Sequence, residues 1–130
     1  MAGTIVADTI QNGAGTSTSM DNAIYGSAKA WVRFAGATGT IANSYNVSSV
    51  TRVSSGQYTV NYSTALPNAN YAPLISVGDS GSTNVFFTVY ANSNTTPTSP
   101  STTQCAVKIV NSATTAVVDA GQVSFAVMSS

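Results

Sequence analysis

The fold class of this chain is decided by the stretch Gln57–Tyr62, which reads QYTVNY. Tyr58, Val60 and Tyr62 alternate with polar residues, and a period of two is typical of a β-strand with one buried face. Tyrosine, valine and threonine also favour strands intrinsically. The stretch therefore predicts a strand whose two tyrosines and one valine point into a core.

Seven further runs have the same strand character, and the Gly, Asn and Ser residues between them suit tight turns. Short strands separated by turns at regular spacing indicate an all-β fold, a β-sandwich or a small barrel, and of these we predict a jelly-roll-like β-sandwich. The seven runs are Thr4–Ile10, Lys29–Phe34, Thr40–Val47, Tyr71–Val77, Val85–Ala91, Gln104–Asn111 and Gln122–Met128. The side chains expected to be mostly buried are Val60, Val89, Val107, Ile109, Phe125 and Val127.

The chain divides into an N-terminal docking arm, residues 1–28, and a β-sandwich body, residues 29–130. The arm holds one apolar run, with Ile5, Val6 and Ile10, followed by a segment rich in Gly and Ser. A lone strand on such a tether is stable only when it pairs with a neighbouring sheet. That sheet belongs either to a partner on a larger particle, which makes these three residues a docking site, or to the chain's own sandwich.

The segment Asn92–Thr103 is the clearest loop, because Pro97 and Pro100 stand there among Asn, Ser and Thr. Exposed loops between well-formed strands often carry binding residues. The residues expected to form an exposed recognition loop are Asn92, Asn94, Thr96 and Ser99.

Charged residues make up only 6% of the chain, against about a quarter in an ordinary domain. Four cations and four anions give a formal net charge of zero, so there is no basic patch for nucleic acid. No stretch reaches the roughly 20 apolar residues of a membrane span, and the N-terminus lacks a signal-peptide pattern. We expect a chain made in the cytoplasm that then assembles, because a nearly uncharged monomer tends to associate.

The short motifs that resemble catalytic sites lack the residues that catalysis would need. Gly78–Gly81 reads GDSG, like a serine-protease nucleophile motif, but the chain has no histidine to act as general base. Asp79 and Asp119 are interpreted as exposed turn residues rather than a catalytic carboxylate pair. Cys105, the single cysteine, stands in an apolar run and is expected to be a small buried residue. We therefore predict no enzymatic activity, no cofactor and no metal site.

Aromatic residues make up 8% of the chain. Tyr and Trp beside Asn and Ser form surfaces suited to carbohydrate or protein, because a flat apolar ring carries a polar group. Most of these aromatics are expected in the core or in a subunit interface, because Tyr58, Tyr62 and Phe87 lie on regular apolar faces of their predicted strands. Trp31 and Arg33 lie on the face of their strand opposite to Val32.

Several short motifs, in order, resemble a module of tailed-bacteriophage fibres and other virion surface proteins. The resemblance spans about residues 17–72, whereas residues 73–130 share only strand character. The motifs are Ala30–Gly36, Ile41, Ser44–Arg52, Gly56–Tyr62, Ala65–Pro67 and Asn70–Ala72.

This resemblance implies a structural virion protein, commonly a homotrimer, that attaches by its N-terminus to other virion proteins and exposes its C-terminal part. It supplies no catalytic residues. Long fibres have extended shafts, so a chain of 130 residues is expected to be a short fibre or a fibre tip that presents a host-recognition surface to a cell-surface receptor. The alternative is a capsid decoration or cement protein, which stabilises the phage head and needs no receptor.

Overall fold

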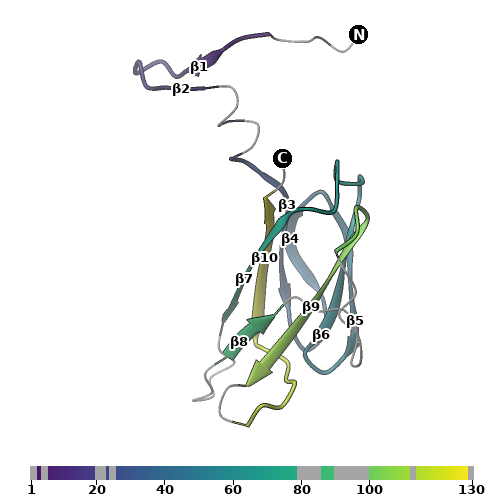
Figure 1. Cartoon of the computed structure of the whole chain (residues 1–130). Helices are drawn as coiled ribbons and strands as arrows, with labels where there is room; N and C mark the ends of the chain where they lie inside the picture. Colours follow the sequence, from purple (N-terminus) through teal and green to yellow (C-terminus); the bar gives the residue numbers. More distant parts are fainter. Residues whose placement is uncertain are drawn as a thin grey trace.

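The structure is a computed structural model that describes residues 3, 6–19, 23, 26–78, 86–89, 100–111 and 114–128, with the backbone alone for residues 86–89. Two four-stranded antiparallel sheets pack face to face as a sandwich, and a short hairpin precedes them (Figure 1). The predicted all-β sandwich is therefore confirmed. The strands are β1 (Thr9–Gln11), β2 (Ser17–Ser19), β3 (Ala28–Ala35), β4 (Ile41–Tyr45), β5 (Val47–Ser54), β6 (Gln57–Tyr62), β7 (Ala72–Gly78), β8 (Phe86–Val89), β9 (Gln104–Asn111) and β10 (Gln122–Met128).

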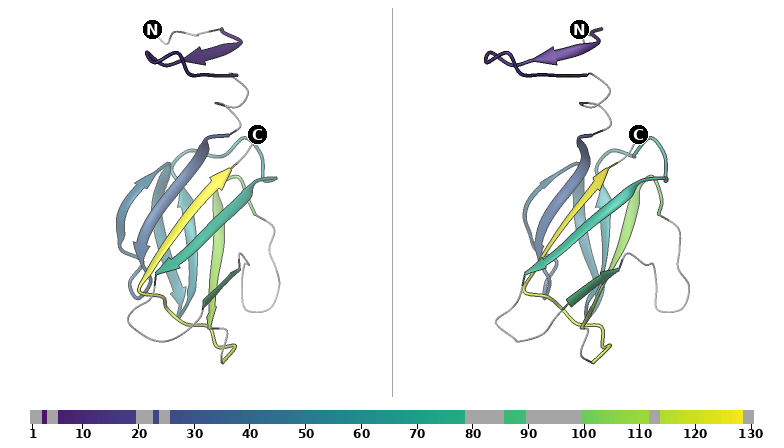
Figure 2. Two further views of the ribbon diagram at one scale, coloured as in Figure 1. Left: turned by 90° about the vertical axis from the view of Figure 1, so that its left-hand side faces the viewer. Right: turned by 60° about the vertical axis from the view of Figure 1, so that its left-hand side comes forward.

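The first sheet has the strand order β4-β3-β10-β7 and the second has β5-β6-β9-β8. Figure 2 shows the first sheet as one layer with the second behind it. The pairs β3–β4, β5–β6 and β8–β9 are neighbours in both sequence and sheet, and the chain changes sheet between β4 and β5. β10 pairs with β3 on one side and with β7 on the other, so both of its edges are hydrogen-bonded within the sheet.

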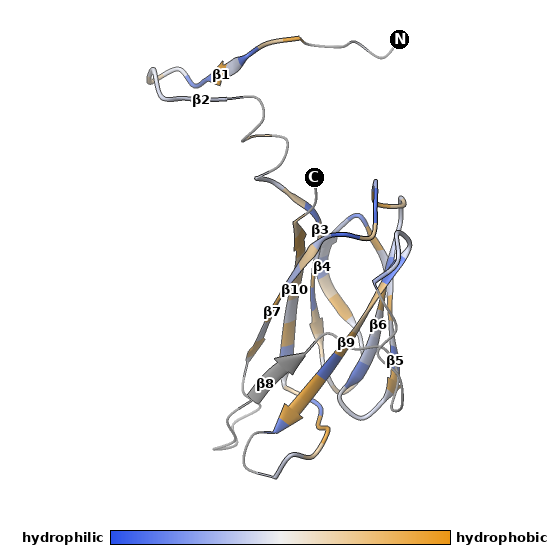
Figure 3. Ribbon diagram, viewed as in Figure 1, coloured by the Kyte–Doolittle hydropathy of each residue, from blue (hydrophilic) through white to orange (hydrophobic). Residues whose placement is uncertain are grey.

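The core lies between the sheets and is built from the inward side chains of both. Phe34 of β3 meets Tyr58 of β6 edge to face, with ring centroids 5.0 Å apart, a favoured aromatic geometry. Figure 3 shows apolar stretches interrupted by polar ones along β9 and β10, as expected for strands with one inward face. Burying one such apolar side chain contributes about 1.5–3 kcal/mol. Of the side chains predicted to be buried, five are at most 2% exposed, and the side chain of Val89 lies outside the described part: the five are Val60, Val107, Ile109, Phe125 and Val127.

The strands β6, β9 and β10 have the bounds predicted from the sequence. The prediction of one continuous strand over Thr40–Val47 is wrong, because β4 ends at Tyr45 and β5 begins at Val47. The chain turns a corner at Asn46, which has a φ of +52°. Its side-chain amide donates to the carbonyls of Lys29 and Thr64 at 3.1 and 3.2 Å, which ties this corner to β3 and to the segment after β6. The segment Ser48–Val53 of β5 was not expected to be a strand, because its polar residues do not alternate with apolar ones; β5 is an edge strand.

The N-terminal arm holds a hairpin where the sequence predicted one strand. β1 covers only the end of the predicted run Thr4–Ile10 and pairs with β2, not with either sandwich sheet. Asn12 shapes the turn, because its Oδ1 accepts hydrogen bonds from the N–H groups of Ala14 and Thr16, both at 3.0 Å. Gly15 supplies a φ of +84° that side-chain-bearing residues rarely adopt. The hairpin lies beyond the end of the sandwich at which β3 begins (Figure 1).

Candidate functional site

The outer face of the first sheet carries a row of exposed apolar side chains that crosses all four strands. Strand register places Tyr45 beside Trp31, Trp31 beside Ala126, and Ala126 beside Leu74. Residues paired across antiparallel strands point to the same face, so these four form one continuous row, which we call the apolar row. Tyr45, Trp31 and Leu74 are 59%, 36% and 56% exposed.

A second row lies two residues further along the strands and is polar. Asn43 pairs with Arg33, Arg33 with Ser124, and Ser124 with Ser76. We call these residues the polar row. The inward residues between the two rows are buried, as Val32 and Phe125 show, so both rows follow from the period of two in β3 and β10.

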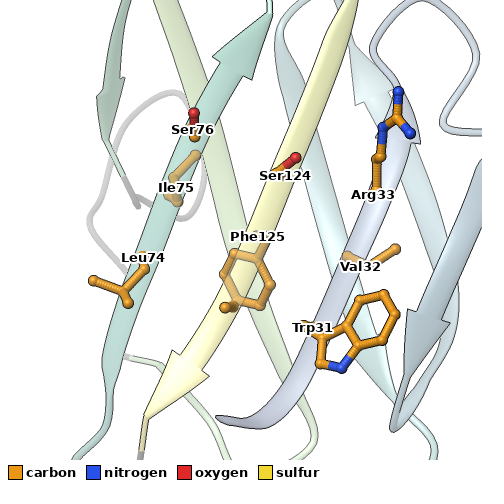
Figure 4. A pocket seen from close by; sticks show the side chains of 9 residues that line it. Trp31, Val32, Arg33, Leu74, Ile75, Ser76, Ser124 and Phe125 are labelled. Atoms are coloured by element: carbon orange, nitrogen blue, oxygen red, sulfur yellow. The ribbon is translucent and has the colours of Figure 1, made fainter.

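Between the rows, the sheet surface is hollowed into a shallow groove of about 350 Å³, within the range of roughly 300–1,000 Å³ typical of small-molecule sites. Figure 4 shows Trp31 on β3 and Leu74 on β7 on opposite sides of β10. The middle strand contributes only Ser124 and Ala126 at this level, so large side chains form the walls and small ones the floor. The groove is lined by Trp31, Arg33, Leu74, Ser76, Ser124 and Ala126, with Val32, Ile75 and Phe125 beneath them.

The charge of this sheet has one sign. Its four strands carry two cations, Lys29 and Arg33, and no carboxylate. Lys29 donates to the Ser27 hydroxyl at 3.2 Å. Arg33 is exposed at the edge of the groove. Arg33 is therefore the charged group that an incoming ligand would meet.

The outer face of the second sheet differs from this surface. Asn61 of β6 donates to the hydroxyls of Ser49 and Thr51 of β5, at 3.0 and 3.4 Å. Thr59 and Ala106 continue the face toward β9. Of the six large apolar side chains exposed in the described part of the chain, three belong to the apolar row. The aromatic character is thus concentrated on the first sheet.

Asp119 was expected to be an exposed turn residue, and that interpretation is wrong. Its carboxylate forms an ion pair with Arg52 and accepts hydrogen bonds from the Gly56 N–H and the Tyr58 hydroxyl, both at 2.8 Å. Partial burial raises the pKa of this carboxyl, but the hydrogen bonds from Arg52, Gly56 and Tyr58, together with the charge of Arg52, outweigh burial and hold the pKa at about 2. The carboxylate joins the segment before β10 to the β5–β6 turn, which is a structural role.

Cys105 is buried, as predicted. Desolvation raises the pKa of its thiol above the ordinary value, which disfavours the reactive thiolate. Within the described ranges, no group of three or more His, Cys, Asp and Glu could hold a metal ion. No helix in that part of the chain is long and apolar enough to cross a membrane.

The residues that the sequence singled out belong to the N-terminal arm and to the segment Asn92–Thr103. Val6 and Ile10 of the arm are 94% and 44% exposed. Their neighbour Ile5 lies outside the described residues, as do the predicted recognition-loop residues Asn92, Asn94, Thr96 and Ser99.

The groove itself was not predicted. The alternation around Trp31 and Arg33 indicated an outward face, but Leu74 and Ala126 join it only through the order of the strands. No protein-family model, curated protein or solved structure matches the chain.

Proposed function

We propose that the chain is a structural virion protein of a tailed phage, a short fibre or fibre tip without enzymatic activity. In this proposal the N-terminal arm anchors the protein to other virion proteins, and the sandwich presents a host-recognition surface. The observation that carries the proposal is that the chain divides into a hairpin without a core of its own and a sandwich with a well-packed core.

The hairpin supports an anchoring role because it lacks a core of its own. Each of its strands has three residues, and an isolated two-stranded hairpin is marginally stable in water. Ile10 on the hairpin and Val6 just before it leave apolar surface exposed. Pairing with a strand of a neighbouring subunit or virion protein would cover that surface and complete the sheet.

The sandwich supports a presenting role because its core is complete without the arm. In the part of the chain that the structure describes, the buried apolar residues all lie between Ala30 and Val127. A rigid body of this kind can hold an exposed groove in fixed geometry, which lowers the entropic cost of binding. The aromatic groove on the first sheet is the surface best suited to recognition.

Removing the hairpin tests the anchor. A chain that lacks residues 1–19 is expected to melt at the temperature of the full chain but to be absent from particles purified from host cells that express it. The double variant Val6→Ser, Ile10→Ser should also lose incorporation, since it removes the exposed apolar groups. Val53→Ser is the matched control, because Val53 is 65% exposed on the sandwich.

Two results would contradict the anchor. The truncated chain would join particles at the level of the full chain, or its melting temperature would fall sharply because the hairpin contributes to the body. A capsid decoration protein is the second candidate, and the hairpin could anchor it equally well. Immunogold labelling of particles separates the two, since a fibre is labelled at the tail and a decoration protein over the head.

A further inference from the structure

We propose that the groove along β10 binds a saccharide that carries a carboxylate group. This inference rests on the proposed function insofar as the groove is taken as the recognition surface. Its chemistry comes from three features of the groove: the aromatic wall, the polar row and the single sign of charge.

The apolar row offers ring faces to a sugar. Trp31 and Tyr45 are neighbours on the outer face, 36% and 59% exposed. A pyranose has flat patches of C–H groups, which lose water favourably against an aromatic ring. Leu74 closes the opposite side of the groove. This wall contacts the apolar face of a sugar without needing any particular hydroxyl.

The polar row supplies the directional contacts. Ser124 and Ser76 each carry a hydroxyl that donates and accepts, and Asn43 adds an amide. These groups stand about 7 Å along the strands from the apolar row, the rise of two residues. A sugar ring held by Trp31 therefore has its substituents beside donors and acceptors.

The charge selects an acidic sugar. Arg33 stands in the polar row, and its sheet carries no carboxylate in any of its four strands. A guanidinium binds a carboxylate through two parallel hydrogen bonds, roughly twice as strong as neutral ones. A neutral sugar would leave this cation unmatched, so a carboxylate is the complementary group.

The geometry disfavours other occupants. A peptide that binds by strand addition needs a free strand edge, and β10, along which the groove runs, has none because β3 and β7 occupy both sides. A second copy placed face to face would set Arg33 and Lys29 against the same two cations, and like charges in contact are unfavourable. An acidic sugar needs no free strand edge, and its binding brings no like charges into contact.

Trp31 is the only tryptophan of the chain, so its fluorescence reports on the groove alone. The experiment titrates the full-length protein with alginate, a soluble polyuronate, and with dextran, a neutral glucan of similar length. Alginate is expected to change the Trp31 emission in a saturable way, and dextran to bind at least about tenfold more weakly, since it lacks the carboxylate.

Arg33→Gln and Lys108→Gln form a matched pair, because each removes one cation from the outer face of a different sheet. Arg33→Gln should weaken alginate binding about tenfold and leave dextran binding unchanged. Lys108→Gln should leave both within about twofold. Dextran sulfate serves as a further arm, since attraction to negative charge in general would respond to both variants alike.

The proposal is overturned if alginate and dextran act equally on Trp31, or if Lys108→Gln matters as much as Arg33→Gln. It is also overturned if Trp31 emission shifts with protein concentration while mass increases and alginate has no effect, because the face is then an interface between copies. No particle enters this titration. A negative titration therefore contradicts saccharide binding but not anchoring by the hairpin. A chain that fails to join particles can, conversely, still bind alginate.

Discussion

Asp119 Oδ1 accepts a hydrogen bond of 2.8 Å from the Tyr58 hydroxyl, although 61 residues separate the two in sequence. Tyr58 is 1% exposed and packs against Phe34 in the core. Burial first, and then this hydrogen bond, raise the pKa of the phenol above its ordinary value. One carboxylate therefore connects the surface ion pair with Arg52 to the centre of the sandwich.

Truncating this carboxylate should destabilise the fold. Asp119→Ala leaves the Tyr58 hydroxyl without its acceptor, and an unsatisfied buried hydroxyl costs about 1–3 kcal/mol. The ion pair with Arg52 adds little, since exposed pairs contribute about 0–1 kcal/mol. Urea unfolding is expected to show a loss of about 2 kcal/mol in the free energy of unfolding. Asp8→Ala on the exposed arm should change nothing, and equal losses in both variants would refute the role of Asp119.

The same carboxyl makes stability depend on pH. Its pKa is about 2 in the folded chain against an ordinary value of 3.8. A lowered pKa contributes stability that is fully present above about pH 4 and is lost as the pH falls toward about 2. Urea midpoints should therefore drop across this window, and the drop should be smaller in Asp119→Asn. An identical pH profile in the two proteins would argue against the assignment.

Gly56 should not tolerate a side chain. It has a φ of +63°, and a Cβ there would lie 2.4 Å from the carbonyl oxygen of Val118. Backbone cannot move aside cheaply, so Gly56→Ala is expected to cost about 2 kcal/mol or more. Gly13→Ala is the control, because a Cβ at Gly13 meets nothing within 4 Å. Thermal melts of the two variants should differ clearly, and similar melting temperatures would show that the turn relaxes.

Val107 and Lys108 test the inside–outside assignment of β9 with adjacent residues. Val107 is 1% exposed, so Val107→Asp would bury an unpaired charge and should abolish the cooperative unfolding transition. Lys108 points to the outer face, and Lys108→Asp should melt close to the wild type. If Val107→Asp folds normally by circular dichroism, the assigned face of β9 is wrong.

Much of the sandwich could be predicted because its inner strands alternate strictly. Gln57–Tyr62, Gln104–Asn111 and Gln122–Met128 became strands with the expected bounds. The edge strand β5 was not predicted, because a strand at the edge of a sheet faces water and its sequence shows no apolar period. Its corner depends on Asn46, whose hydrogen bonds to Lys29 and Thr64 join residues that are distant in sequence.

The groove could not be predicted from the sequence, for a related reason. Trp31, Ala126 and Leu74 come from three strands, and only the order β3-β10-β7 makes them neighbours. The position of Asp119 depends likewise on the packing of one sheet on the other. Local patterns specify which face of a strand turns inward, whereas cross-strand partners are a property of topology.

We expect the protein to be a homotrimer in solution. A chain with 6% charged residues and exposed apolar side chains on its arm gains by association. Light scattering coupled to size-exclusion chromatography should give about 40 kDa, three times the 13.2 kDa chain. A single species at the mass of one chain would exclude the trimer.

The central claim is that this chain is a virion surface protein anchored by its N-terminal hairpin. A cryo-EM map of purified phage particles tests it most directly. The account predicts sandwich-shaped density that projects from the tail, with β1 and β2 at the junction and the groove along β10 exposed to solvent. Density for the chain over the capsid, with β1 and β2 directed away from it, or a particle that contains no such density, would contradict the claim.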